Sequence, residues 1–326
     1  MRSTHFLAVF IFFHLLEVQC FVNSQQKGFL YNDLGNAFLS RDGAAQVADN
    51  GLLQLTDHRD KYQTGHAFYS RPFQLNGNVS FSTTFVVAIA SEFGANGLSG
   101  QGMAFVITPQ RRIPGALPNQ YLGLFNESSN GQSANHLLAV ELDTVYNIEF
   151  DTIQEPHVGI DINSLKSLNS TVPAYPVDGK SEKINLNSGE PVQVWVNYDW
   201  IDKLLTVSLA PLHASKPDVP LLSLSKDLST VFLDSMYVGF SASTQSIPTY
   251  HYVLGWSFQI DGEAPALNLA SLPKLPQPAP PPKKKSKLVI ILPATLGPIF
   301  VLALVAIIWY LCKKCRTPPP QFITRT

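Results

Sequence analysis

Eight short segments of the chain concentrate or alternate apolar residues in the way that β-strands do. They are rich in β-branched and aromatic residues, and clusters of Gly, Pro, Asn, Asp or Ser bound each of them. The expected strands are Val79–Ile89, Gly102–Thr108, Leu137–Thr144, His157–Ile162, Val192–Tyr198, Leu204–Leu209, Met236–Ala242 and Tyr250–Ile260. Tyr198–Lys203 resembles a hairpin turn between two of them. Regular short strands with few helical patterns predict an all-β sandwich of two sheets.

A continuous apolar run near the N-terminus has a different character. Phe6–Leu16 is about 11 residues long, which is too short to span a bilayer, and small or polar residues follow it. This arrangement predicts a secretory signal peptide over residues 1–24. Cleavage after Ser24 suits the requirement for small residues, and cleavage after Cys20 is the second choice.

A second apolar run, Leu288–Leu311, has 24 residues and no charge, enough for a single transmembrane helix. Lysines flank it on both sides, so orientation rests on the signal peptide, which predicts a type I single-pass protein of the plasma membrane. The expected layout is an extracellular head at residues 25–270, a Pro/Lys-rich stalk at 271–287 and a cytosolic tail at 312–326.

Composition limits the classes of partner and the kinds of cross-link that the chain can have. Formal net charge is -1, with 23 basic and 24 acidic residues, so no overall attraction to a phosphate backbone exists and a nucleic-acid partner is not expected. The chain has three cysteines, of which Cys20 leaves with the signal peptide and Cys312 and Cys315 lie at the membrane edge. The head therefore has no disulfide and needs a large apolar core. Palmitoylation suits Cys312 and Cys315 better than metal binding does.

Three sequons support the secretory prediction. Asn78, Asn126 and Asn169 each begin an N-x-[ST] pattern without proline, the acceptor pattern for N-glycosylation.

The residues best suited to bind a cation or a substrate lie in the segment LLAVELDT and shortly after it. Glu141 and Asp143 flank Leu142, so their carboxylates project from one face of the expected strand. Two like charges on an apolar strand need compensation by a cation, a shared proton or a substrate. Asn147, Asp151 and His157 follow within a short distance; oxygen ligands suit Ca²⁺, and histidine with carboxylates suits Mn²⁺. The alternative is a half-solvated strand followed by incidental polar loop residues.

Four segments closely resemble the legume-type (L-type) lectin domain, and the resemblance covers residues 27–260. They are Leu138–Thr144, His157–Ser164, Tyr237–Thr244 and His251–Phe258. More narrowly, Gly115–Asn126, the stalk and the span resemble the extracellular half of plant L-type lectin receptor kinases. The resemblance implies a concanavalin-like jelly-roll sandwich with a Mn²⁺/Ca²⁺ pair beside a shallow sugar site.

Residue by residue, the resemblance implies that Glu141, Asp143 and His157 ligate Mn²⁺ and that Asp143 bridges both ions. It further implies that the Val145 carbonyl and the Asn147 side chain ligate Ca²⁺ and that Asn147 also bonds the sugar.

The chain departs from the family pattern at three positions. Thr152 stands where the second bridging carboxylate is expected, so either Asp151 turns in through a changed loop or metal affinity falls. Gln101 replaces an aspartate of the sugar site and can bond a hydroxyl only without charge assistance. Val145 replaces a ring that stacks on sugar.

Enzymatic activity is not expected. The chain lacks the Gly-rich, Val-Ala-Ile-Lys and His-Arg-Asp motifs of kinases, and Thr144, Val145 and Tyr146 leave no third carboxylate for a laminarinase-type hydrolase. The leading hypothesis is a membrane-anchored lectin-like receptor that binds a glycan or another cell-surface ligand, with a receptor kinase as a further partner. The alternative is a degenerate lectin fold that binds an apolar ligand, a peptide or a protein without metal or sugar.

Overall fold

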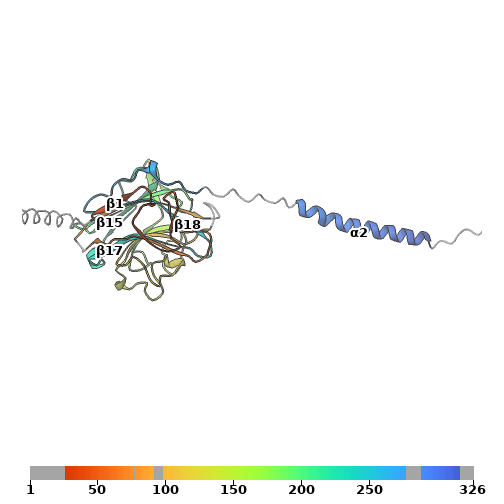
Figure 1. The fold of residues 1–326 in the computed structure, drawn as a ribbon, viewed down its shortest axis with the longest axis horizontal. Helices are drawn as coiled ribbons and strands as arrows, with labels where there is room; N and C mark the ends of the chain where they lie inside the picture. The colour runs from red at the N-terminus through yellow and green to blue at the C-terminus, as the bar shows by residue number, and fades with distance from the viewer. Residues whose placement is uncertain (1–25, 76–77, 92–97, 277–287, 316–326) are drawn as a thin grey trace, which may run out of the picture. The chain divides into compact units, whose positions relative to one another are not determined.

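The structure is a computed structural model that describes residues 26–75, 78–91, 98–276 and 288–315, with side chains described for 298–314 in the last range. The chain divides into two units, residues 1–275 and residues 276–326. Figure 1 shows the first unit as a β-structure, with β1, β15, β17 and β18 labelled, and the second with the helix α2. The expected signal peptide lies outside the described residues, as does most of the expected stalk.

The first sheet of the head has the strand order β16-β15-β14-β7-β18-β4-β3, and β1 also pairs with β18. Its pairs are antiparallel. The strands are β1 (Gly28–Tyr31), β3 (Gln46–Val47), β4 (Leu53–Thr56), β7 (Phe81–Ser91), β14 (Val192–Asp199), β15 (Leu204–Pro211), β16 (Leu222–Ser225) and β18 (Thr249–Ile260).

The second sheet has the order β11-β10-β9-β8-β17-β5-β2, and β6 also pairs with β17. The strands are β2 (Leu39–Gly43), β5 (Thr64–Tyr69), β6 (Phe73–Gln74), β8 (Gly102–Thr108), β9 (Leu138–Asp143), β10 (His157–Ile162), β11 (Asn169–Thr171) and β17 (Ser235–Ser243). A separate hairpin joins β12 (Ala174–Val177) to β13 (Lys180–Lys183), and short 3-10 helices are η1 (Asn119–Tyr121), η2 (Ser133–Asn135), η3 (Leu228–Thr230) and η4 (Leu269–Ser271).

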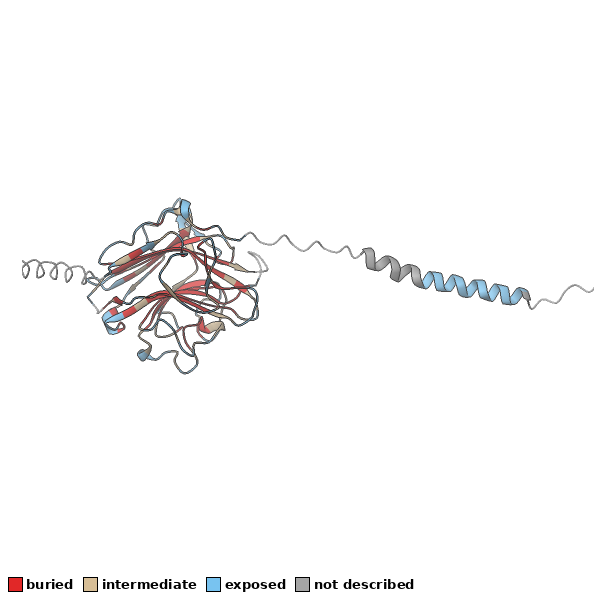
Figure 2. Cartoon of the chain, viewed as in Figure 1, coloured by how far each residue is buried: buried red, intermediate tan, exposed pale blue. Residues whose placement is uncertain are grey.

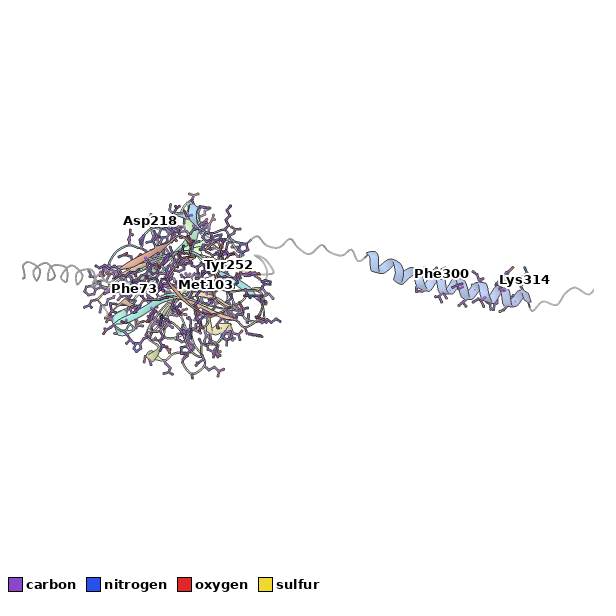
Figure 3. The ribbon with its side chains drawn as sticks, in the orientation of Figure 1. Phe73, Met103, Asp218, Tyr252, Phe300 and Lys314 are labelled. Carbon is purple, nitrogen blue, oxygen red and sulfur yellow. The ribbon has the colours of Figure 1, made fainter. Side chains whose placement is uncertain are left out.

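The main core lies between the two sheets because alternate residues of each strand point inward. Phe85 of β7 and Trp256 of β18 meet Phe105 of β8 and Phe240 of β17 in one buried cluster. Met103 of β8 belongs to the same cluster (Figure 3). Figure 2 shows buried residues concentrated on the strands of both sheets. Because the head has no disulfide, its fold depends on the burial of apolar surface, which stabilises the folded state by about 25 cal/mol per Å².

Each sheet also buries part of its outer face. Loop residues including Leu122, Leu124 and Phe125 cover Phe68 and Val106 of the second sheet. The segment after β18 covers the outer face of the first sheet with apolar side chains. The covering side chains are Leu267, Leu269, Leu272 and Leu275. They belong to one apolar cluster with Leu52, Val86, Ala88, Tyr252 and Leu254. All three clusters lie within residues 29–275, so the head has a complete core of its own.

All eight expected strands are present, with ends shifted by a few residues, and the two-sheet sandwich is confirmed. Trp200–Lys203 forms the expected turn between β14 and β15. The strands near the N-terminus were not expected. β2 has the sequence LSRDG and β5 the sequence TGHAFY, and their Gly and charged residues obscure the strand pattern.

The second unit contains α2, a helix from Leu288 to Cys315. Within the residues that the structure describes, no helix combines the length and the apolar content that crossing a membrane requires. The span expected over Leu288–Leu311 is therefore not confirmed. Cys312 is exposed and forms no disulfide with any described residue.

Candidate functional site

The candidate site is built on the outer face of β9 and β10. Along β9, Leu138, Val140 and Leu142 enter the core between the sheets, so Glu141 and Asp143 point to the opposite face. This is the orientation that the sequence predicted for the two carboxylates.

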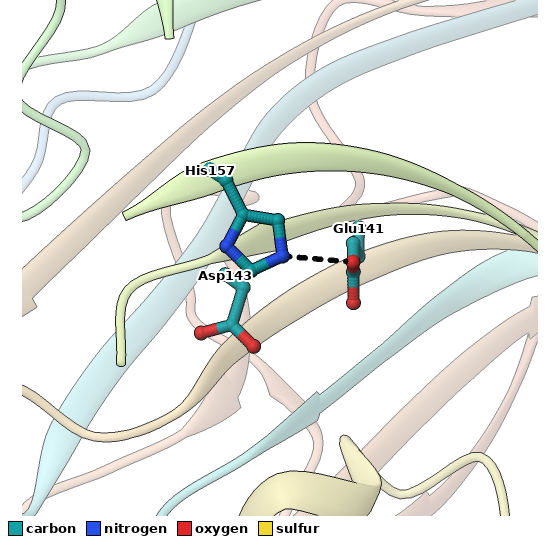
Figure 4. A group of neighbouring side chains, drawn as sticks. All are labelled: Glu141, Asp143 and His157. Atoms are coloured by element: carbon teal, nitrogen blue, oxygen red, sulfur yellow. Dashed lines mark hydrogen bonds and ion pairs between the residues drawn. The ribbon is translucent and has the colours of Figure 1, made fainter. Parts of the chain in front are cut away.

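The antiparallel register of β9 and β10 brings a histidine to these carboxylates. His157 pairs with Asp143, and Gly159 pairs with Glu141. One ligand atom from each of Glu141, Asp143 and His157 lies within 4.8 Å of the others, and all three residues are buried. Figure 4 shows the three side chains converging. His157 Nε2 lies 3.1 Å from Glu141 Oε1. This buried group could hold a metal ion.

A glycine makes room for this arrangement. A Cβ at Gly159 would overlap Ser167 Oγ and the Glu141 carboxylate, so only glycine leaves space for both. Ser167 Oγ donates to Glu141 Oε1 at 2.7 Å. Glu141 is therefore held between the histidine ring and a serine hydroxyl, directly over β10.

The loop after β9 carries the oxygen groups predicted as further ligands. The Val145 N–H donates to Asp143 Oδ1 at 2.7 Å, and the Asn147 N–H donates to Asp151 Oδ2 at 2.5 Å. Asp151 Oδ1 lies 3.8 Å from His157 Nε2, and its side chain is 4% exposed. Thr152, by contrast, is exposed. Of the two arrangements considered for this loop, the structure has the one in which Asp151 turns toward the cluster.

Gln101 and Asn147 adjoin each other at the edge of the site. Gln101 precedes β8 and is 1% exposed, and its Oε1 accepts a hydrogen bond from Asn147 Nδ2 at 2.9 Å. Asn147 Nδ2 also donates to the Val145 carbonyl at 2.8 Å. The burial of Gln101 indicates that it orients Asn147 rather than presenting a surface of its own.

Burial sets the electrostatics of the cluster. Burial and then the charge of Glu141 raise the pKa of Asp143 well above its ordinary value. Burial also raises the pKa of Asp151. Burial alone lowers the pKa of His157, but the hydrogen bond that its ring donates to Glu141 and the charges of the surrounding carboxylates raise it to about 9. A divalent cation would compensate these crowded carboxylates, and a set of carboxylate oxygens with one imidazole nitrogen suits a transition metal.

Two further residues of the site were missed from the sequence. Asp161 is fully buried, its Oδ1 lies 2.8 Å from Ser167 Oγ, and its Oδ2 has no partner among the described residues. Burial and then the charge of Glu141 raise its pKa well above the ordinary value. The segment HVGIDI places Asp161 four residues after His157 and thus on the same strand face. That spacing could have identified Asp161, whereas Ser167 offered no local pattern.

The three sequons differ in their surroundings. Asn78 is exposed. Asn126 Nδ2 donates to the Gly115 carbonyl at 3.0 Å, and Asn169 Nδ2 donates to the Ser223 carbonyl at 2.9 Å. Because a glycan is attached at this nitrogen, Asn78 offers the most accessible acceptor of the three.

The chain is similar to known proteins both in sequence and in fold. A family model described as the legume lectin domain matches residues 26–274. The chain is 44% identical over 310 residues to L-type lectin-domain containing receptor kinase I.3 of Arabidopsis thaliana, with 93% of this chain and 46% of that protein covered. The lectin from Bauhinia forficata, solved in complex with GalNAc, shares 30% identity with a TM-score of 0.61, over 73% of this chain and 99% of that one. The chain spans less than half the length of the curated relatives that it matches.

Proposed function

The chain belongs to the legume lectin domain family, and from that premise we propose that its head binds carbohydrate at a site organised by metal ions. The buried cluster of Glu141, Asp143 and His157 carries this proposal, because its crowded carboxylates are costly to bury without a cation. The predicted resemblance to this family and to its receptor kinases is confirmed by the family match and by the relatives.

In this proposal, Mn²⁺ is held by Glu141, Asp143, Asp151 and His157. Ca²⁺ is held by Asp143, Asp151, the Val145 carbonyl and the Asn147 side chain. The inward orientation of Asp151 supports its role as the second bridging carboxylate in place of Thr152. Bound metal would neutralise the carboxylates and hold the loop from residue 144 to 151 in one conformation.

The sugar would be bound at the edge of this loop. Asn147 offers an amide to a sugar hydroxyl, and Gln101 holds that amide through its Oε1. Because Gln101 is neutral and buried, it offers the sugar no charge-assisted hydrogen bond, so we expect weak binding of the sugar. Binding of single sugars should therefore be weak, and avidity from several sugars on one glycan should increase it.

A glycan array tests this proposal directly. The head, residues 26–276, should bind a defined group of glycans in Ca²⁺ and Mn²⁺, and a chelator should abolish that binding. Asp143→Asn should do the same, whereas Asp178→Asn, at an exposed turn, should leave binding unchanged. Glycan binding that survives both the chelator and Asp143→Asn would contradict the metal-organised site.

We also propose that the head is displayed outside the cell on a type I single-pass protein. The apolar runs Phe6–Leu16 and Leu288–Leu311 support this topology, and the curated relatives are named receptor kinases. A receptor kinase is the proposed signalling partner, because the curated relatives that the chain matches are receptor kinases. Protease added to intact cells should digest the head, and protection of the head would contradict this topology.

A further inference from the structure

Tyr62 lies on the same rim of the second sheet as the proposed sugar site. Four paired residues end neighbouring strands along this rim, in the order Asp143, Gly102, Ser243 and Thr64. Neighbouring strands lie about 4.8 Å apart, so the three spacings of this row cover about 14 Å. Asn147 follows the loop from one end of the row, and Tyr62 immediately precedes the strand at the other end. The two residues therefore lie near opposite ends of the rim.

Hydrogen bonds between loops connect the rim from one end to the other. The Tyr62 N–H donates to the Gln245 carbonyl at 3.1 Å, in the loop after β17. The Asn119 N–H, at the start of η1, donates to the preceding carbonyl of that loop at 3.3 Å. Gln120 Nε2 donates to Glu149 Oε2 at 3.4 Å, which joins η1 to the loop after β9. Tyr62 and the proposed sugar site therefore belong to one connected surface.

A buried carboxylate holds the loop that carries Tyr62. Asp57 is 2% exposed and accepts hydrogen bonds from the Arg59 N–H and from Gln63 Nε2, each at 2.8 Å. The Gln63 N–H in turn donates to Thr244 Oγ1 at 2.9 Å. Because these bonds already order the loop, a ligand that contacts Tyr62 does not need to order it on binding.

Tyr62 combines an exposed ring with a strained backbone. Its φ is +57°, in the left-handed region that bulky residues rarely adopt. Its exposed fraction is 54%, whereas on the same rim Tyr146 is half-buried and Tyr121 and Phe150 are buried. The exposed ring contributes little to the core, so core packing does not explain why this conformation is kept. Such strain is typical of functional positions.

The two ends of the rim offer different chemistry to a glycan. Asn147 offers an amide to sugar hydroxyls, but Val145 beside it offers no ring. Tyr62 offers a flat apolar surface on which the C–H face of a pyranose can pack. Gln120 and Gln245 lie between them and are partly exposed. A single sugar is too short to use both ends, because the row between them covers about 14 Å.

We propose that Tyr62 forms a second sugar subsite and that the preferred ligand is a linear glycan of two or more sugars, bound from Asn147 to Tyr62. This proposal rests on the proposed lectin function of the same site. One sugar is hydrogen-bonded at Asn147, and another packs on the ring of Tyr62. The ring supplies the apolar contact that Val145 does not.

The length of the glycan tests this assignment in the metal-loaded head. The probes are β-1,4-linked glycans of glucose, mannose, galactose and N-acetylglucosamine with one to four sugars, together with fragments of the glycan that an array binds most strongly. Calorimetry should show that the trisaccharide of the bound series binds about tenfold more tightly than its single sugar, a gain larger than the number of sugars accounts for.

Matched variants localise this gain. Tyr62→Gly removes the ring and the backbone strain together, because glycine adopts a positive φ freely. It should abolish the gain and leave both the affinity for the single sugar and the melting temperature nearly unchanged. Tyr62→Phe keeps the ring and should keep the gain. Phe38→Ala removes a ring that is 51% exposed at the opposite end of the second sheet, and it should change neither affinity.

Three outcomes would overturn the proposal. The first is equal affinity for single sugars and trisaccharides, and the second is a gain that survives in Tyr62→Gly. The third is an equal loss in Tyr62→Gly and Phe38→Ala, which would indicate a general effect on the fold. Chelator-sensitive binding of single sugars beside any of these results would leave the lectin function standing. Failure to bind any glycan would contradict both proposals.

Discussion

A buried histidine on β18 should make the head lose stability as the pH falls below about 6.5. His251 is completely buried, and its Nδ1 lies 2.6 Å from Thr56 Oγ1. The Thr56 hydroxyl donates to the Thr249 carbonyl at 2.7 Å, so its oxygen accepts from His251 Nδ1–H. His251 Nε2 has no partner among the described residues. A proton added there would create a buried cation with no acceptor.

The magnitude follows from the pKa. Burial lowers the pKa of His251 from its ordinary value of 6.5 to about 3. Because the unfolded chain takes up this proton near pH 6.5 and the folded chain does not, protons favour unfolding between pH 6.5 and pH 3. At 1.36 kcal/mol per pH unit, the free energy of unfolding should fall by about 2 kcal/mol between pH 7.5 and pH 5 from this residue alone.

His251→Leu isolates this contribution. The variant removes the titrating group and keeps an apolar side chain of similar size, so unfolding by urea at pH 7.5 should differ little from the wild type. At pH 5 the variant should be the more stable of the two by about 2 kcal/mol, relative to their difference at pH 7.5. His157 also titrates: without metal its pKa is raised to about 9, so it adds stability below pH 6.5 that is lost as the pH rises through 9. Because the wild type and the variant both contain His157, this contribution cancels in the comparison. Parallel pH profiles for the wild type and His251→Leu would refute the reasoning.

Three further outcomes are expected. Chelation should lower the melting temperature of the head, because metal at 100 times its Kd adds about 2.7 kcal/mol to the free energy of unfolding. An unchanged melting curve would mean that no metal was bound. In that case Thr152→Asp should restore the sensitivity of the melting temperature to the chelator. Gly159→Ala should cost about 1–3 kcal/mol and abolish that sensitivity, because its Cβ displaces the Glu141 carboxylate; retained metal binding measured by calorimetry would contradict this. Asn78→Gln should remove more glycan mass from the secreted head than Asn126→Gln or Asn169→Gln, and an equal gel shift for all three would count against the accessibility argument.

The regular alternation of apolar residues was enough to predict the long strands and the two-sheet sandwich. It also placed Glu141 and Asp143 on one strand face, because side chains of a strand alternate strictly between its two faces. Short strands such as β2 escaped prediction. Its sequence LSRDG is largely exposed, and its strand conformation comes from pairing with β5 rather than from its own residues.

The tertiary structure decided which polar groups meet. The register of β9 and β10 placed His157 opposite Asp143, and the loop between them turned Asp151 inward and left Thr152 exposed. Neither outcome follows from spacing along the chain, because a shift of one residue in either segment reverses which side chains face the cluster. The burial of His251, whose Nε2 has no partner among the described residues, likewise arises from segments distant in sequence. Local patterns determine strands, whereas cavities and buried charges depend on how those strands and loops pack together.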